Sequence, residues 1–182
     1  MMLPQLQALT RAQHQQLALD HCAAFEADLG AAQQLFSPYR IRPLGAHIDH
    51  QLGRVASIAT NQGITVTFTP NPDRRLRAQS AGFGSVADVL IGARQSAQGD
   101  WADYLRGSAV VLDQTDLPAG LDISVAGHLG EVGLSSSAAV TLAYLSALQS
   151  AAGAPPDPAR LIQWSQQVEN EFLGLQSGAG DQ

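Results

Sequence analysis

The sequence predicts an α+β fold in which a mixed β-sheet packs against helices. Segments with the alternation of strands and segments with helical spacing follow one another without the strict alternation of a doubly wound sheet. Of the 182 residues, 45% are apolar and only 14% are charged, so the chain can bury a substantial core. This length suits one ordinary domain or a large fragment of a longer protein.

The first half of the chain is predicted to hold one helix followed by extended segments. The helix is expected over 5–28, where leucines recur at helical spacing, and Gly30 provides its stop. The extended segments are 36–44, 54–59, 64–70 and 75–80. Asn61-Gln62-Gly63 is typical of a hairpin turn, so the two segments on either side of it are predicted to pair as separate strands.

Helices dominate the predicted second half. A helix is expected over 101–112, and 121–125 alternates as a strand does. Two further helices close the chain. Gly153 is suited to end the first of them. Asp157 and Pro158 are suited to the N-cap and the first residue of the second.

The charged residues exclude several classes of protein. The formal net charge is −6, which disfavours a nucleic-acid partner because such a partner requires a basic patch. All ten basic residues are arginines, and the sequence contains no lysine. This excludes a Schiff-base enzyme and a phosphate-binding loop of the Walker type, which both need a lysine. A phosphate site in this chain must use backbone N–H groups, arginine or a metal ion.

The expected location follows from features that the sequence lacks. No apolar run approaches the roughly 18 residues that a membrane span needs. The first residues lack the charged and apolar regions of a signal peptide. A single cysteine, Cys22, excludes an internal disulfide and is predicted as a half-buried helix residue. We therefore expect a cytoplasmic protein with no membrane partner.

A serine-rich segment, 130–139, follows a predicted strand and opens a helix. Serine is unfavourable inside a helix but favourable at its N-terminus, where its oxygen caps free N–H groups. Ser135, Ser136 and Ser137, after Gly133, offer N–H groups, hydroxyls and the positive end of the helix dipole to one anion. The alternative is a well-capped structural helix, although capping alone needs only one serine.

A second segment combines arginines, a glycine, histidines and an aspartate. Its extended pitch places Arg40 and Arg42 on one face. Gly45 allows a tight turn, after which His47 and Asp49 can point into a common cleft. A metal site built from its histidines and aspartate would lack a further ligand cluster, and a purely structural loop is another alternative.

The last residues are open to two interpretations. Taken alone, Glu169 and Glu171 read as a solvated helix face, and the glycine-rich stretch 174–182 reads as a flexible tail. A family resemblance favours the opposite interpretation.

These three segments together resemble the GHMP kinases, and within them the galactokinase branch. Residues 133–139 are similar to the second motif of the family, whose glycine-rich loop and helix N-terminus hold the phosphates of ATP. Arg40, Gly45, His47 and Asp49 match the galactokinase signature that lines the sugar site.

Two positions in this signature resemble the galacturonokinase subfamily, which acts on a uronic acid. Ala46 stands where galactokinases carry Glu, and His50 stands where they carry Tyr. The entrance to the serine loop, with Glu131 and Val132 in place of further glycines, is also similar to that subfamily.

The end of the chain resembles the galactokinase segment that delivers the catalytic aspartate. Glu169 lies five residues before Gly174, as does the Mg²⁺-binding glutamate of the superfamily. Gly178 and Asp181 match the glycine that approaches the sugar and the catalytic aspartate. The helix with Trp101, Tyr104 and Gly107 is also similar to a galactokinase helix, with core packing as the alternative.

The resemblance implies that 1–182 form the sugar- and phosphate-binding N-terminal domain of a GHMP kinase, with the C-terminal domain absent. Such a fragment is expected to be inactive alone and to self-associate through uncovered apolar surface.

The resemblance also implies a role for each motif residue. Asp181 is the expected general base, and Arg40 is expected to hold it ionised and to stabilise the moving phosphoryl group. The expected sugar-binding residues are Ala46, His47, Asp49, Gly178 and Arg42. The expected ATP phosphate-binding residues are Gly133, Leu134, Ser135, Ser136, Ser137 and Ala138. Mg²⁺ is the expected cofactor, with Ser136 and Glu169 as its protein ligands.

The expected function is transfer of the γ-phosphate of ATP to the anomeric hydroxyl of galacturonic acid. Three alternatives remain open: a galactokinase acting on galactose, a non-catalytic sensor of sugar or nucleotide, and an inactive truncated domain.

Overall fold

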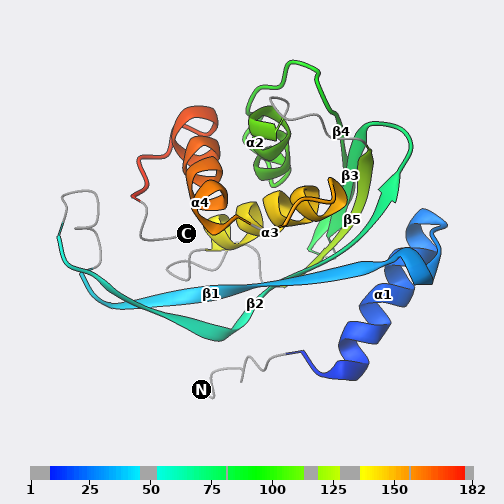
Figure 1. The fold of residues 1–182 in the computed structure, drawn as a ribbon, viewed down its shortest axis with the longest axis horizontal. Coiled ribbons are helices and arrows are strands. Elements are labelled where there is room, and N and C mark those ends of the chain that lie inside the picture. Colours follow the sequence, from blue (N-terminus) through cyan, green and yellow to red (C-terminus); the bar gives the residue numbers. More distant parts are fainter. Residues whose placement is uncertain are drawn as a thin grey trace.

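Within the described residues, a five-stranded sheet carries α2, α3 and α4 on one face and α1 on the other (Figure 1). The computed structural model describes residues 9–45, 53–80, 82–112, 119–127, 136–155 and 157–178. Its helices are α1 (Arg11–Phe25), the 3-10 turn η1 (Leu29–Ala31), α2 (Asp103–Leu112), α3 (Ser136–Ala151), α4 (Pro158–Gln167) and the π-helical turn η3 (Val168–Phe172). Its strands are β1 (Gln33–Leu44), β2 (Ala56–Asn71), β3 (Arg75–Ser80), β4 (Phe83–Leu90) and β5 (Gly120–Ala126).

The sheet is mixed, with the strand order β1-β2-β5-β3-β4. β3 and β5 run parallel, whereas the other neighbouring strands are antiparallel. A parallel pair needs a long crossover connection, and here that connection contains β4 and α2. This arrangement confirms the predicted α+β class.

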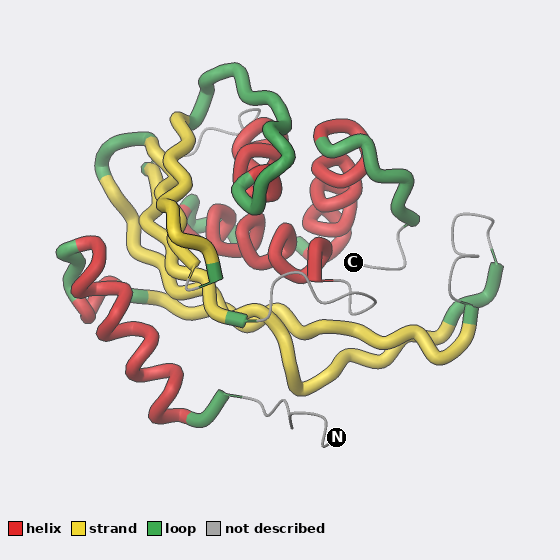
Figure 2. Tube along the Cα trace, turned by 180° about the vertical axis from the view of Figure 1, so that it is seen from behind, coloured by secondary structure: helices red, strands yellow, loops and turns green. Residues whose placement is uncertain are grey.

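One face of the central strands is apolar and forms the core. Its residues are almost fully buried: Ile64, Val66 and Phe68 of β2, Leu76 and Ala78 of β3, and Leu121, Ile123 and Val125 of β5. They share one face because successive strand side chains point to opposite sides. α3 packs on β1 and β2, α2 packs on β3 and β4, and α4 packs on both helices. Figure 2 shows the same layers from behind.

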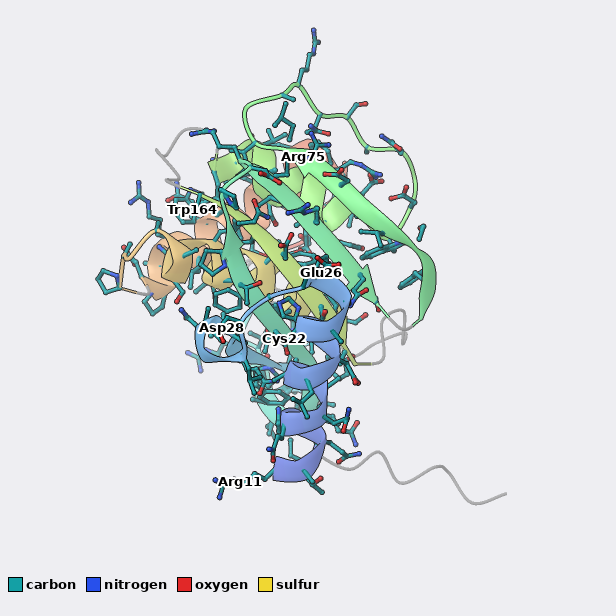
Figure 3. The ribbon with its side chains drawn as sticks, turned by 90° about the vertical axis from the view of Figure 1, so that its right-hand side faces the viewer. Arg11, Cys22, Glu26, Asp28, Arg75 and Trp164 are labelled. Carbon is teal, nitrogen blue, oxygen red and sulfur yellow. The ribbon has the colours of Figure 1, made fainter. Side chains whose placement is uncertain are left out.

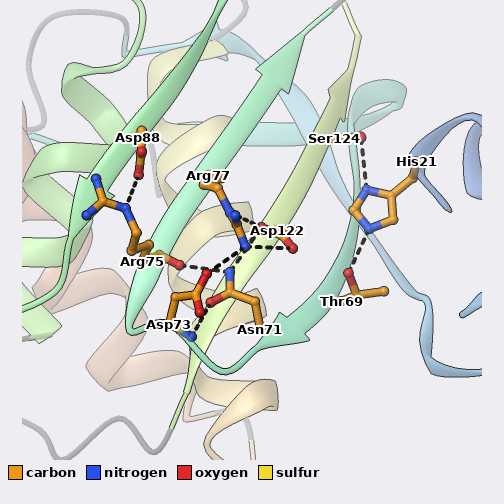
Figure 4. A network of polar contacts seen from close by, with 9 residues as sticks. All are labelled: His21, Thr69, Asn71, Asp73, Arg75, Arg77, Asp88, Asp122 and Ser124. Atoms are coloured by element: carbon orange, nitrogen blue, oxygen red, sulfur yellow. Dashed lines mark hydrogen bonds and ion pairs between the residues drawn. The ribbon is translucent and has the colours of Figure 1, made fainter. Parts of the chain in front are cut away.

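The opposite face of the central strands is polar. Asp122 accepts hydrogen bonds from Arg77 Nε at 2.6 Å and from Asn71 Nδ2 at 3.0 Å (Figure 4). Nearer the sheet edge, Arg75 Nε donates to Asp88 Oδ1 at 2.7 Å. Buried charge at Asp122 is thus paired and hydrogen-bonded, as burial of a carboxylate requires.

α1 lies against part of this polar face (Figure 3). The helix begins with a capping box, in which Thr10 and Gln13 satisfy each other's backbone N–H groups. Near its other end the fully buried His21 places Nδ1 2.9 Å from Ser124 Oγ and Nε2 3.1 Å from Thr69 Oγ1. These contacts dock α1 onto β5 and β2 (Figure 4).

The predicted hairpin around Asn61-Gln62-Gly63 was wrong. The two segments that it was expected to separate form one long strand, β2, which is antiparallel to β1. Pro38 pairs with Gly63 and Arg40 pairs with Ala59, so β2 advances four residues where β1 advances two. The turn-like residues therefore form a bulge inside β2.

Two local features explain why the bulge replaces a turn. A methyl group added at Gly63 would overlap the carbonyl oxygen of Ser37. The backbones of β1 and β2 therefore approach each other here so closely that only glycine fits at position 63. Thr60 Oγ1 lies 2.9 Å from the carbonyl oxygen of Gln62 and 3.2 Å from that of Tyr39. The Thr60 hydroxyl thus lies within hydrogen-bonding distance of two backbone carbonyl groups at the bulge, where the regular pairing of β1 with β2 is interrupted.

Most other elements agree with prediction apart from their bounds. The predicted stop of the first helix at Gly30 was wrong, because α1 ends at Phe25 and Glu26 adopts the left-handed cap with a φ of +53°. Asp157 caps α4 through the N–H groups of Ala159 and Arg160, and Gly153 adopts a φ of +69° after α3, both as predicted. The helix expected from residue 101 begins at Asp103. β4 was not predicted, because only two of its side chains are buried and its first half lacks apolar alternation.

Two further features are the burial of the single cysteine and the apolar character of the helices. Cys22 is half-buried on α1, as expected (Figure 3). Across the described ranges, no helix combines the length and the apolar character needed to cross a membrane.

Candidate functional site

The N-terminus of α3 opens into a pocket of about 320 Å³. α3 begins at Ser136, within the segment where the serines predicted a helix start. The first N–H groups of a helix have no partner inside the helix, and they carry the positive end of its dipole. The lining residues are Phe83, Gly99, Asp100, Trp101, Tyr104, Ser136, Ser137 and Val140. A helix N-terminus is a common site for an anion. The carboxylate of Asp100 also lines this pocket, where Arg106 donates a hydrogen bond to it.

Aromatic rings form another wall of the pocket. Phe83 at the start of β4 stacks on Trp101, with ring centroids 5.1 Å apart and planes inclined by 10°. Tyr104 is half-buried one helical turn after Trp101. Burial, and then the charges of Glu169 and Asp103, raise the pKa of the Tyr104 hydroxyl above its ordinary value.

The loop before α2 is tied to the first turn of that helix. The buried carboxylate of Asp103 accepts hydrogen bonds from the N–H groups of Gln98 at 2.9 Å and Gly99 at 2.7 Å. Arg106 Nη1 donates to Oδ1 of both Asp100 and Asp103 at 2.6 Å. The guanidinium of Arg106 thereby lowers the pKa of Asp100. Because this loop carries part of the aromatic wall, these bonds fix the shape of the pocket.

Glu169 lies on η3 and is only 2% exposed, which rules out a solvated position. Glu171 on the same turn is exposed. Ser177 Oγ donates to Glu169 Oε2 at 2.5 Å. The helix widens at η3, where the N–H of Leu173 reaches the carbonyl oxygen of Val168 at 3.0 Å. The stretch 174–178 is therefore fixed to η3 instead of forming the flexible tail suggested by its composition.

α2 approaches η3 closely because residue 107 is a glycine. A methyl group at Gly107 would lie 2.6 Å from Cγ1 of Val168 and 3.0 Å from Cδ1 of Phe172. Both distances are shorter than van der Waals contact. The glycine therefore allows the helix that carries Tyr104 to pack against the turn that carries Glu169.

The predicted sugar-binding segment is described only in part. Arg40 and Arg42 lie on β1, and both are half-buried. Gly45 follows the strand with a φ of +81°, as the predicted tight turn requires. Three predicted sugar-binding residues lie outside the described residues: Ala46, His47 and Asp49.

The predicted phosphate-binding and catalytic residues are also described only in part. Ser136 and Ser137 line the pocket. The side chain of Ala138 is buried in the core, so a phosphate contact there would use its backbone N–H. Gly178 is described directly after Ser177. Four predicted residues lie outside the described residues: Gly133, Leu134, Ser135 and Asp181.

Of the two residues predicted to hold Mg²⁺, Ser136 lines the pocket, whereas Glu169 is not among the lining residues. In the described part of the chain, no three His, Cys, Asp or Glu side chains gather closely enough to hold a metal ion by themselves. Mg²⁺ commonly uses only one or two carboxylates, together with waters and substrate phosphates. The Ser136 hydroxyl and the buried Glu169 carboxylate are hard oxygen donors of the kind that Mg²⁺ prefers.

Comparison with known families identifies the class of protein. Residues 103–182 match the profile of the GHMP kinases N terminal domain. These residues include α2, β5, α3, α4 and η3, which carry most of the pocket and Glu169. Residues 103–182 therefore belong to the GHMP kinases N terminal domain, and the sheet and helical layer have the fold of that domain.

The relatives that the chain resembles include a galacturonokinase and several galactokinases. It is 35% identical over 176 residues to a galacturonokinase of Arabidopsis thaliana, covering 85% of this chain and 42% of the relative. It is 32% identical over 157 residues to a galactokinase of Lacticaseibacillus casei, covering 84% of this chain and 41% of the relative. The chain thus spans less than half the length of these relatives.

Solved structures share the fold of this chain. The galactokinase of Lactococcus lactis complexed with galactose superimposes with a TM-score of 0.85 at 25% identity, covering 92% of this chain and 45% of that one. The mevalonate kinase of Methanococcus jannaschii, at 17% identity and a TM-score of 0.71, shares the fold.

The aromatic wall is the part of the site that sequence reasoning did not assign. Trp101 and Tyr104 matched a family helix, with core packing as the alternative, and the structure places both at the pocket. The signal for both residues was their resemblance to that family helix. Phe83 had no such signal, because its ring partner is distant in the sequence.

Proposed function

We propose that the protein is an ATP-dependent sugar 1-kinase that phosphorylates the anomeric hydroxyl of galacturonic acid, and that 1–182 form its sugar- and phosphate-binding domain. The observation that carries this proposal is the pocket in which the N-terminus of α3 meets the Phe83–Trp101 stack. The acceptor sugar is proposed from the relatives and from Ala46.

The pocket combines the two chemistries that a nucleotide needs. The N–H groups of the first turn of α3 and the hydroxyls of Ser136 and Ser137 suit the phosphates. Phe83, Trp101 and Tyr104 suit a heterocyclic base, which stacks on aromatic rings. A volume of about 320 Å³ lies within the range of about 300–1,000 Å³ that is usual for small-molecule sites.

Phosphoryl transfer would depend on positioning and on charge stabilisation. The anomeric oxygen attacks the γ-phosphorus as the bond from that phosphorus to the leaving ADP oxygen breaks. Asp181 accepts the proton of the attacking hydroxyl. Arg40 keeps Asp181 ionised and stabilises the charge on the phosphoryl oxygens. Bound Mg²⁺ would neutralise phosphate charge, with Ser136 and Glu169 holding it.

Ala46 is the reason for preferring galacturonic acid. A Glu at this place, as in galactokinases, is expected to accept a hydrogen bond from the C6 hydroxyl of galactose. A uronic acid carries a carboxylate there, and two like charges ~4 Å apart repel by ~4 kcal/mol at an effective dielectric of 20. Alanine removes this repulsion and leaves room for the planar carboxylate. Arg42, on the strand that leads to Ala46, can add attraction.

The test is a kcat/KM comparison of galacturonate and galactose in the full-length protein with ATP and Mg²⁺. We expect formation of the sugar 1-phosphate and a higher kcat/KM for galacturonate. Ala46→Glu is expected to reverse this preference. No phosphorylation of either sugar by the purified protein would overturn the kinase proposal.

Galactokinase activity is the second candidate. It is favoured by the 32% identity to a bacterial galactokinase and by the superposition on a galactokinase complexed with galactose. Equal or better use of galactose by the unmodified protein would select this candidate over the uronic-acid one.

A further inference from the structure

We infer that Asn170 and Ser177 are positioning residues that hold Glu169 and the segment leading to Asp181. The inference rests on the proposed function, because it concerns the proposed Mg²⁺ ligand and the proposed general base. Neither Asn170 nor Ser177 has a role in the mechanism so far. Both belong to a loop that closes back on η3.

The side-chain amide of Asn170 binds both backbone groups of Ser177. Asn170 Nδ2 donates to the carbonyl oxygen of Ser177 at 3.1 Å, and the N–H of Ser177 donates to Asn170 Oδ1 at 2.8 Å. Two bonds from one planar amide fix the orientation of the Ser177 peptide groups as well as their distance. An aspartate would retain only the acceptor, and an alanine would retain neither bond.

The hydroxyl of Ser177 transmits this constraint to Glu169. Ser177 Oγ lies 2.5 Å from Glu169 Oε2 and 3.2 Å from Asn170 Oδ1. A hydroxyl has one hydrogen to donate, and the shorter contact to the stronger acceptor identifies Glu169 as its recipient. One oxygen of the buried carboxylate is thereby oriented, which is how outer residues commonly fix a metal ligand.

The backbone makes this arrangement possible. The N–H of Leu175 donates to the carbonyl oxygen of Glu169 at 2.8 Å, and Gly174 between them adopts a φ of +70°. The chain therefore reverses direction directly after η3 and returns to Asn170. Asp181 follows Ser177 by four residues in the sequence. The same clamp thus anchors Glu169 and the start of the segment that delivers the proposed base.

A purely structural role would lower stability without changing the Mg²⁺ requirement of the proposed reaction. A positioning role predicts that kcat falls while the KM for the sugar changes little. We therefore propose three variants of the full-length protein: Asn170→Ala, which removes the clamp, Ser177→Ala, which removes the hydroxyl, and Ser177→Thr, which retains it. Glu171→Gln, an exposed change on the same turn, is the control.

The first measurement is steady-state kinetics with ATP, the preferred sugar and varied Mg²⁺, on variants whose melting curves show that they are folded. Asn170→Ala and Ser177→Ala are expected to lower kcat by about 10–100-fold and to raise the Mg²⁺ concentration for half-maximal activity. The KM for the sugar should change little. Ser177→Thr is expected to restore most of the activity, and Glu171→Gln to leave it unchanged.

The second measurement does not depend on activity. Hydrogen exchange of the Ser177 backbone N–H, without nucleotide or metal, is expected to be slow in the unmodified protein and in Ser177→Ala. It is expected to be about tenfold faster in Asn170→Ala.

The two measurements separate the possible failures. Unchanged exchange at Ser177 in Asn170→Ala overturns the clamp. An active kinase whose Asn170→Ala and Ser177→Ala variants keep kcat within about twofold overturns the positioning role. A protein that phosphorylates no sugar overturns the proposed function, while the exchange rates still decide whether the clamp exists.

Discussion

Glu169 and Glu171 lie on the same turn, yet only Glu169 is buried. A buried carboxylate needs a partner for its charge, because removing an ion from water is costly. Ser177 supplies one hydrogen bond to it. This contrast between two glutamates separates a candidate Mg²⁺ ligand from a surface residue.

At this residue scale, we predict that Trp101→Ala weakens ATP binding. Removal of the indole ring deletes its stack on Phe83 and one wall of the pocket. The KM for ATP is expected to rise by about 5–150-fold, because stacking on a base contributes ~1–3 kcal/mol. The sugar KM is expected to change little. Trp164→Ala is the control, since Trp164 packs under Arg160 on α4 and not at the pocket.

We also predict that Asp181→Asn removes most of kcat while sparing ATP affinity. The amide keeps the shape of the carboxylate but does not accept the proton, and general-base catalysis is usually worth about 10²–10⁴-fold. Turnover numbers and ATP titration of the full-length variant check this outcome. Asp88→Asn, at an exposed pair with Arg75, serves as control. Near-normal kcat in Asp181→Asn would show that another group is the base.

At the scale of elements, the packing of α2 against η3 depends on Gly107. We predict that Gly107→Ala destabilises the protein, although alanine favours a helix by ~1 kcal/mol over glycine. Its methyl group would lie 2.6 Å from Val168 Cγ1, and such overpacking typically costs ~1–3 kcal/mol. Displacement of η3 should also lower kcat through Glu169.

Thermal unfolding and kinetics of Gly107→Ala check this prediction. Gly84→Ala is the matched control, because nothing lies within 4 Å of a methyl group added there. A stability of Gly107→Ala equal to or above that of the unmodified protein would mean that α2 and η3 can separate without cost.

At the scale of the whole molecule, His21 joins the N-terminal helix to the sheet. Burial lowers its pKa from the ordinary value of 6.5, and the charge of Asp122 opposes that shift only in part. Above pH 6.5 the imidazole is neutral in both the folded and unfolded states. Below pH 6.5 the unfolded chain binds a proton that the folded protein resists, so stability falls as the pH falls.

We therefore predict a lower melting temperature at pH 5.5 than at pH 7.5, with a contribution from His21. One pH unit of unequal protonation corresponds to ~1.4 kcal/mol, or a shift in melting temperature of about 3–6 °C for a domain of this size. His21→Gln, which keeps hydrogen-bonding groups but does not titrate, is expected to reduce this difference. His14→Gln on the same helix is the control. An equal pH dependence in His21→Gln and the unmodified protein would contradict the prediction.

Features that depend on neighbouring residues can be predicted from the amino-acid sequence. Apolar alternation around Phe68 and Ile123 specifies the core face of two strands, since strand side chains alternate. Asp157 before Pro158 specifies the start of α4. The serines before Ala138 indicate the start of α3, because serine oxygens satisfy free N–H groups. The motif residues also indicated the resemblance to GHMP kinases.

Other features depend on packing between residues that are far apart in the chain. Asn61-Gln62-Gly63 carries a turn signal, yet it forms a bulge because β1 pairs across it. Glu169 is polar, yet it is buried because Gly107 admits the turn against α2 and Ser177 returns to bind its carboxylate. Phe83 becomes part of the pocket only because the sheet brings β4 to Trp101. Local propensity specifies an element, whereas burial and pairing are set by packing between distant segments, which no short stretch of sequence encodes.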